Sequence, residues 1–134
     1  MIYILLNIVP ILAATFASLA IGFVMTKVAN GARHSVGFYI AAFVAEFWLC
    51  SILAGALILA PPQAGEWVMA LGSAVVIWIG FVVPALVVSL GHRGESAGRI
   101  ARDCGHWLVA MFLMALVLKT IGLVPPPGAP GMSG

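Results

Sequence analysis

Charged side chains are scarce in this chain. Its 134 residues include six Lys or Arg and four Asp or Glu, which makes 7% charged residues. A typical soluble domain carries about 25%. The net charge is only +2, and the basic residues are scattered, unlike the dense basic surface of a nucleic-acid-binding protein. We therefore expect neither an ordinary soluble domain nor a nucleic-acid partner.

Motifs for catalysis are also missing. The chain has no phosphate-binding glycine loop, no nucleophile elbow and no HExxH zinc motif. Cys50 and Cys104 form no CxxC pair, and a disulfide between them is not expected because they fall at different depths. We predict that the protein is not an enzyme, with no catalytic residue, no metal and no cofactor. A lipid- or quinone-modifying enzyme is a third alternative without a visible acid–base pair.

Long apolar runs fill almost all of the sequence. Hydrophobic residues make up 63%, and crossing ~30 Å of hydrocarbon takes about 20 of them in a helix. The first run is too long for a signal peptide and lacks a basic start. We predict an all-α, four-span transmembrane helix bundle in a single domain, residues 1–124, with spans at about 2–27, 36–60, 66–91 and 104–124. The Pro- and Gly-rich tail, residues 125–134, should be extended or disordered.

The basic residues predict an orientation. Five of the six lie in or beside the first and third connections, residues 27–35 and 92–103. These are Lys27, Arg33, Arg93, Arg99 and Arg102. By the positive-inside rule these loops are cytoplasmic and both termini lie outside, in a bacterial inner (plasma) membrane. Lys119 is the exception, toward the outer face.

Glu46 is the strongest candidate for a functional residue. It lies ten residues into the second span, near mid-membrane, where an ionisable group costs at least about 2.5–3.5 kcal/mol and by default marks a functional site. It could exchange protons in a transporter, donate a hydrogen bond near Ser73 or Trp78 of span three, or pair with a partner subunit. No basic residue of the chain clearly reaches it, and its charge state stays open.

Other residues are candidates for helix interfaces. Ala14, Ser18 and Gly22 recur four apart and allow close helix approach. Packing within the bundle is favoured over a dedicated oligomer interface. Trp48 and Trp78 fall near mid-span, so their indole N–H groups should need partners inside the bundle.

A polar cluster is expected where span four begins at the inner face. Asp103 and His106 are three residues apart, hence neighbours on a helix, and an acidic residue favours a helix N-terminus. An N-terminal cap with an interfacial histidine is the favoured interpretation. A metal site with His34 and His92 is the alternative, but its spacing matches no known ligand pattern.

Two prolines and one short repeat complete the pattern. Pro10 and Pro84 should kink spans one and three. The sequence Ile-Gly-Phe-Val at residues 21–24 recurs at residues 79–82, an offset of 58. This agreement is short enough to arise by chance among apolar helices.

The third span carries a family resemblance. Its sequence Trp78-Ile79-Gly80-Phe81-Val82-Val83-Pro84, with Asn7 and residues 13–22 of the first span, resembles a bacterial family of small four-span membrane proteins, domain of unknown function seventeen sixty-one. The family's Trp, Tyr and Pro cluster is replaced here by Phe23-Val24-Met25-Thr26. The resemblance implies a fold and a location, but no reaction.

Two functions follow as hypotheses. The favoured one is a non-enzymatic accessory or structural subunit that docks on a larger membrane complex. The alternative is a homo-oligomeric transporter or channel, either for small solutes or coupled to protons, that uses Glu46. The bilayer is a partner in both, together with other subunits in the first and self-association in the second.

Overall fold

The protein folds as a bundle of helices. The computed structural model describes residues 2–30, 34–61 and 63–128, apart from the side chains of residues 26 and 28–30. The elements are α1 (Ile2–Leu6), α2 (Ile8–Asn30), α3 (Val36–Leu59), α4 (Glu66–Ile77), the π-helical η1 (Trp78–Val82), α5 (Val83–His92) and α6 (Ala97–Ile121). No strand occurs in these ranges. The prediction of an all-α chain is confirmed.

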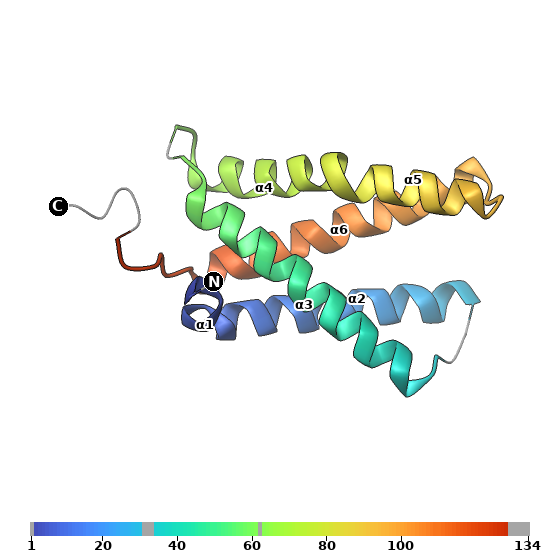
Figure 1. The fold of residues 1–134 in the computed structure, drawn as a ribbon, viewed down its shortest axis with the longest axis horizontal. Coiled ribbons are helices and arrows are strands. Elements are labelled where there is room, and N and C mark those ends of the chain that lie inside the picture. The colour runs from blue at the N-terminus through green and yellow to red at the C-terminus, as the bar shows by residue number, and fades with distance from the viewer. Residues whose placement is uncertain (1, 31–33, 62, 129–134) are drawn as a thin grey trace.

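Four helical stretches are long and apolar enough to cross a membrane. They are α2, α3, the continuous run α4–η1–α5, here called the third span, and α6. Figure 1 shows α1, the described segment that follows α6, and the end of α3 with the start of α4 at one end of the bundle, here called the terminal end. The other two connections lie at the opposite end, the connection end. The protein is therefore built as a multi-pass membrane protein.

The connection end carries mainly basic residues, whereas the terminal end carries an ion pair. Lys27 lies in the last turn of α2, and Arg93, Arg99 and Arg102 lie around the start of α6, all at the connection end. At the terminal end the Lys119 ammonium lies 2.6 Å from a Glu66 carboxylate oxygen. Arg33 lies outside the described residues.

The regular α-helix is disturbed just before each proline that was expected to kink a span. The first span is interrupted at Asn7, between α1 and α2, three residues before Pro10. In the third span the Val83 N–H bonds to the Trp78 carbonyl, and η1 widens the helix just before Pro84. Proline has no N–H and its ring clashes with the preceding turn, so the backbone loosens on its N-terminal side.

The fourth helix begins earlier than predicted. α6 starts at Ala97, not near residue 104, because the Ser96 side chain caps it by accepting a hydrogen bond from the Arg99 N–H. The third connection thus shortens to residues 93–96. Asp103 lies in the second turn of α6, so the prediction that it caps the helix is wrong.

The chain ends are joined to each other at the terminal end. α6 stops at Gly122, which has a φ of 93° and so adopts a conformation that glycine tolerates best. The Asn7 side chain donates to the carbonyls of Tyr3 and Val124 and accepts from the Val124 N–H. Residues 122–128 are not helical, and residues 129–134 lie outside the described part of the chain.

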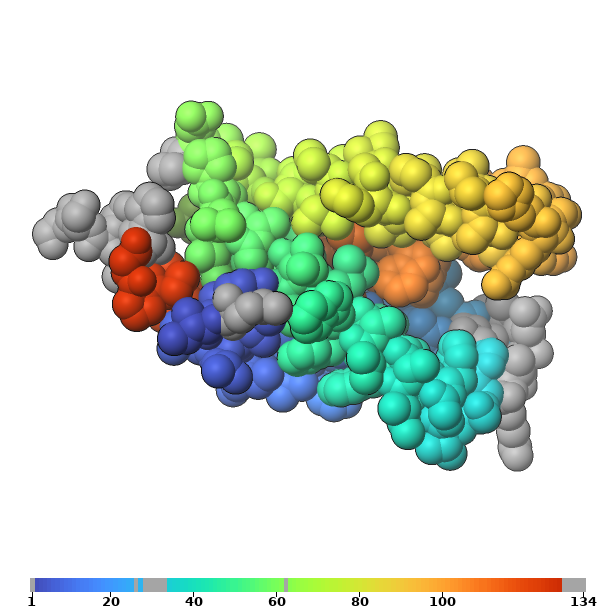
Figure 2. All heavy atoms as spheres, in the orientation of Figure 1, coloured from blue at the N-terminus to red at the C-terminus, as the bar shows by residue number. Residues whose placement is uncertain are grey.

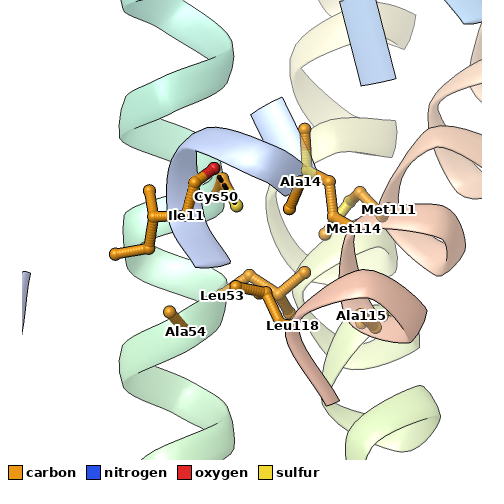
Figure 3. Close-up of a cluster of buried hydrophobic side chains, with 10 residues drawn as sticks. Ile11, Ala14, Cys50, Leu53, Ala54, Met111, Met114, Ala115 and Leu118 are labelled. Carbon is orange, nitrogen blue, oxygen red and sulfur yellow. Dashed lines mark hydrogen bonds between the residues drawn. The ribbon is translucent and has the colours of Figure 1, made fainter. Parts of the chain in front are cut away.

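The hydrophobic core fills the terminal half of the bundle. Leu53 of α3 lies against Leu118 of α6, and Met111 and Met114 reach toward Ala14 of α2 (Figure 3). These side chains are fully buried. The core therefore ties α2 and α3 to the second half of α6.

The connection half is packed much less closely. Glu46 is the first buried residue of α3, and no side chain from Val36 to Ala45 is buried. Figure 2 shows this part of α3 standing away from α5, with atoms of α6 visible between them. The bundle is therefore closed at its terminal end and open at its connection end.

Candidate functional site: a groove beside Glu46

Glu46 lies at the boundary between the packed and the open half. Ten residues of helix precede it in α3, which places it about 15 Å along the helix axis. Its side chain is only 9% exposed. The Ser18 hydroxyl of α2 lies beside its carboxyl group. Even so, neither Ser18 Oγ nor Glu46 Oε2 has a hydrogen-bond partner with bonding geometry among the described residues.

Among the described residues these are the two buried side-chain polar atoms without a hydrogen-bond partner. Other hydroxyl groups within the spans satisfy themselves on the preceding helical turn, as when Thr15 donates to the Ile11 carbonyl and Ser51 to the Phe47 carbonyl, each at 2.8 Å. Burying a polar group without a partner costs free energy. Burial of the Glu46 carboxyl with one oxygen unpaired therefore costs stability.

A groove of about 720 Å³ opens from Glu46 toward the connection end. It lies between α2, the first half of α3 and the start of α6. Its volume falls within the range of small-molecule sites, about 300–1,000 Å³. Six aromatic side chains line it: Phe16, Phe23, Phe38, Tyr39, Phe43 and Trp107.

The aromatic rings cover the groove along its length. Phe16 of α2 and Phe43 of α3 meet near Glu46, with their ring centroids 5.5 Å apart. Near the mouth the His34 ring stacks on Phe38, with centroids 4.2 Å apart. The Lys27 ammonium lies 4.6 Å from the centroid of the Phe23 ring. The groove is therefore apolar and aromatic, with basic groups only where it opens.

α6 supplies the remaining wall through His106 and Trp107. The His106 Nδ1 atom lies 3.0 Å from the Met25 sulfur of α2. A Cβ atom on Gly22 would lie 4.0 Å from His106 Nε2. His106 thus packs between α6 and α2 and borders the groove.

The small-residue stripe faces the inside of the same chain. Ala14 and Ser18 are fully buried, and α2 makes its most extensive contacts with α6. Gly22 is partly exposed at the groove. The structure therefore places these residues in packing within the bundle.

The two mid-span tryptophans differ. The Trp78 indole donates a 2.8 Å hydrogen bond to the Cys104 carbonyl, which joins the third span to α6. Trp48 is 52% exposed and has no hydrogen-bond partner among the described residues. The expectation of an internal partner is right for Trp78 and wrong for Trp48, which points to the outside of the bundle.

The expected neighbours of Glu46 on span three are not its neighbours. The Ser73 hydroxyl donates to the Met69 carbonyl, and Trp78 is engaged by α6. Glu46 lies against α2 instead. That hypothesis for Glu46 was wrong because α3 turns this face toward span one.

The polar cluster at the start of α6 is not a metal site in the described part of the chain. There, no group of three His, Cys, Asp or Glu side chains could hold a metal ion. Asp103 lies 4.0 Å from Arg102, and both cysteines are free thiols, as expected.

Sequence reasoning found Glu46 but missed the groove. The aromatic residues of α2 and α3 that line it look like ordinary span residues, because nothing in their spacing marks which face α3 leaves uncovered. The role of Asn7 in holding the C-terminal segment was missed as well. The available signal was a polar residue, Asn7, in an apolar run and three residues before Pro10.

Comparisons with protein-family models, with curated proteins and with solved structures returned no match. The resemblance to the four-span family of unknown function therefore stays a prediction.

Proposed function

We propose that the protein is a proton-coupled transporter of small solutes in a bacterial inner membrane, with Glu46 as the group that exchanges the proton. One observation carries the proposal: a carboxyl that is nine-tenths buried, with an unpartnered oxygen, borders an apolar groove. Intramembrane carboxyls with access to a cavity are typical of proton relays and substrate sites.

The surroundings of Glu46 favour binding over catalysis. In the described residues no hydrogen bond joins it to a histidine or cysteine, since His106 contacts Met25 and Cys50 donates to the Ile11 carbonyl. An acid–base or nucleophile pair would need such a contact. The proposal therefore keeps the expectation of a protein that is not an enzyme.

The basic residues support the orientation in the membrane that we propose for the protein. Lys27, Arg93, Arg99 and Arg102 gather at the connection end, which the positive-inside rule assigns to the cytoplasm. In this orientation the groove opens to the cytoplasmic side, and both termini lie outside.

A complete path across the membrane would have to pass the core cluster. A smaller hollow of about 460 Å³ lies at the terminal end, bordered by Glu66 and Lys119. Ile11, Leu53 and Leu118 are fully buried and belong to the packed cluster of the terminal half. Transport therefore requires α3 to move against α2 and α6, either in one chain or in a homo-oligomer.

An accessory subunit of a larger membrane complex is the second candidate. Only 6% of the third span is buried, against 33% of the fourth. A sparsely covered apolar helix can pack against helices of another membrane protein. This candidate makes no use of the groove.

Proteoliposomes with a trapped pH-sensitive dye test the proposal. Neutral, anionic and cationic apolar compounds are added in turn to wild type, to Glu46→Gln and to Glu66→Gln as a matched control at the other end. A compound that drives proton movement in wild type and in the control, but not in Glu46→Gln, supports the transporter. Proton movement with none of them, together with stoichiometric co-migration of the native protein with a larger complex on a native gel, favours the accessory subunit.

A further inference from the structure

We infer that the groove takes a lipophilic organic cation, which exchanges for one proton on Glu46. This inference rests on the proposed function, because it names the class of solute that the same site would hold.

The first argument is the unpartnered oxygen of the Glu46 carboxyl. Glu46 Oε2 is buried and accepts no hydrogen bond from a described residue. A buried carboxylate is tolerated when a cation or a hydrogen-bond donor compensates it. Because no basic side chain of the described residues lines the groove beside Glu46, an ionised Glu46 would take its compensating charge from the ligand.

The second argument is the aromatic lining. Aromatic faces attract cations through the ring quadrupole, and rings without nearby water do so more strongly. The groove already shows this interaction at its mouth, where the Lys27 ammonium lies 4.6 Å from the Phe23 centroid. Deeper inside, Phe16 and Phe43 offer similar rings next to Glu46. An apolar cation would use both the rings and the carboxylate.

The basic groups at the mouth do not favour an anion at the Glu46 end. Lys27 follows Ser18, the residue beside Glu46, by nine positions of α2, or about 14 Å along the helix. That separation is far beyond the ~4 Å of an ion pair, and the Lys27 side chain is exposed at the mouth. An anion at the deep end would meet the carboxyl without a nearby positive charge.

The exchange balances in charge and atoms. The empty site holds Glu46 as a neutral carboxylic acid. A monovalent cation enters, the O–H bond of the carboxyl breaks, and the proton leaves to water at the mouth of the groove. The site then holds a carboxylate paired with the cation, so one positive charge enters for each one that leaves.

Other titratable groups face the same space. Lys27 of α2, His34, Tyr39 of α3 and His106 of α6 line the groove. Cys50 follows Glu46 by one turn of α3, where its thiol donates to the Ile11 carbonyl. The proposal assigns the released proton to Glu46, so among these groups only removal of the Glu46 carboxyl should abolish the proton release that accompanies binding.

The experiment compares two ions of the same shape and opposite charge. Tetraphenylphosphonium and tetraphenylborate are titrated calorimetrically into the purified full-length protein in detergent, in two buffers of different ionisation enthalpy, which gives the number of protons released. Wild type should bind the phosphonium ion and release close to one proton per ion. Glu46→Gln should bind it about 30-fold more weakly or worse, as expected when one partner of a buried charge pair is removed, and release no proton.

Controls separate this inference from a folding defect and from the proposed function. Glu66→Gln should behave as wild type, and Glu46→Asp should retain proton release even if it binds more weakly. Stronger binding of tetraphenylborate, or phosphonium binding that is equal in wild type and Glu46→Gln, overturns the cation inference. If a neutral or anionic solute drives Glu46-dependent proton movement in the proteoliposomes, the proposed function stands while the cation inference fails. If no class of solute does so and neither ion binds, both fail.

Discussion

The two ends of the bundle handle polar groups in opposite ways. At the terminal end Asn7 is 1% exposed and makes three side-chain hydrogen bonds, two of them to Val124 beyond α6. Toward the connection end Glu46 is 9% exposed and keeps one oxygen without a partner. In a span without water, the first arrangement stabilises the fold and the second costs stability.

Packing follows the same division. The buried core draws on α2, α3, α4 and α6 at the terminal end, whereas α3 has no buried side chain before Glu46. A closely packed half beside a loosely packed half is an arrangement that would suit ligand entry. The residues that stabilise the fold and the candidate functional residues are thus separated along the long axis of the bundle.

Leu53→Ala should show the largest effect on stability. Leu53 is fully buried in the terminal core, and a buried Leu→Ala change costs about 2–5 kcal/mol because a cavity remains. Unfolding in mixed detergent micelles measures the change in free energy. Leu59→Ala is the matched control, since Leu59 is 74% exposed and should cost far less. Equal losses would mean that the terminal half is not the stable core.

Asn7→Ala should have the next largest effect on stability. It removes both Asn7 hydrogen bonds to Val124, whereas the Tyr3 carbonyl keeps its bond from the Asn7 N–H, and each lost bond is worth about 0.5–1.5 kcal/mol. Thermal unfolding of the detergent-solubilised protein should shift downward, and limited proteolysis should cut the C-terminal segment faster. Asn7→Asp keeps the acceptor for the Val124 N–H and should lose less. If the alanine variant resists the protease as well as wild type does, the Asn7 hydrogen bonds do not hold the C-terminal segment in place.

Glu46→Met should raise the stability of the fold, whereas the two preceding substitutions lower it. It replaces a buried carboxyl that has an unpartnered oxygen by an apolar side chain of similar length, so we expect stabilisation by about 1–3 kcal/mol. The same unfolding assay measures it, with Glu66→Met as the control at the exposed ion pair. A destabilised Glu46→Met would show that the carboxyl has a structural role and would weaken the functional assignment.

Trp78→Phe should show the smallest effect. It removes the hydrogen bond to the Cys104 carbonyl, worth about 0.5–1.5 kcal/mol, while most of the ring packing remains. Trp48→Phe removes an indole N–H that has no described partner and should leave stability unchanged. The difference between the two variants isolates the bond between the third and fourth spans.

Some features were predictable residue by residue. Pro10 and Pro84 predicted where the helices of spans one and three are disturbed, because the missing N–H of a proline acts locally on the preceding turn. Glu46 stood out because a carboxyl in an apolar run is costly wherever it points. The start of α6 was misplaced because Arg99 and Arg102 looked like loop residues, whereas Ser96 provides a cap and both arginines reach water from the first helical turns.

The sequence by itself determined the helical class, the four apolar spans and the scarcity of catalytic motifs, because length, hydropathy and proline chemistry act along the chain. Only the tertiary structure decided which faces meet. It turned Trp48 outward and Trp78 toward α6, buried Ala14 and Ser18 inside one chain, and left a groove beside Glu46. The physical reason is that every face of an apolar span is compatible with lipid, so hydropathy carries no record of which face packs against a helix.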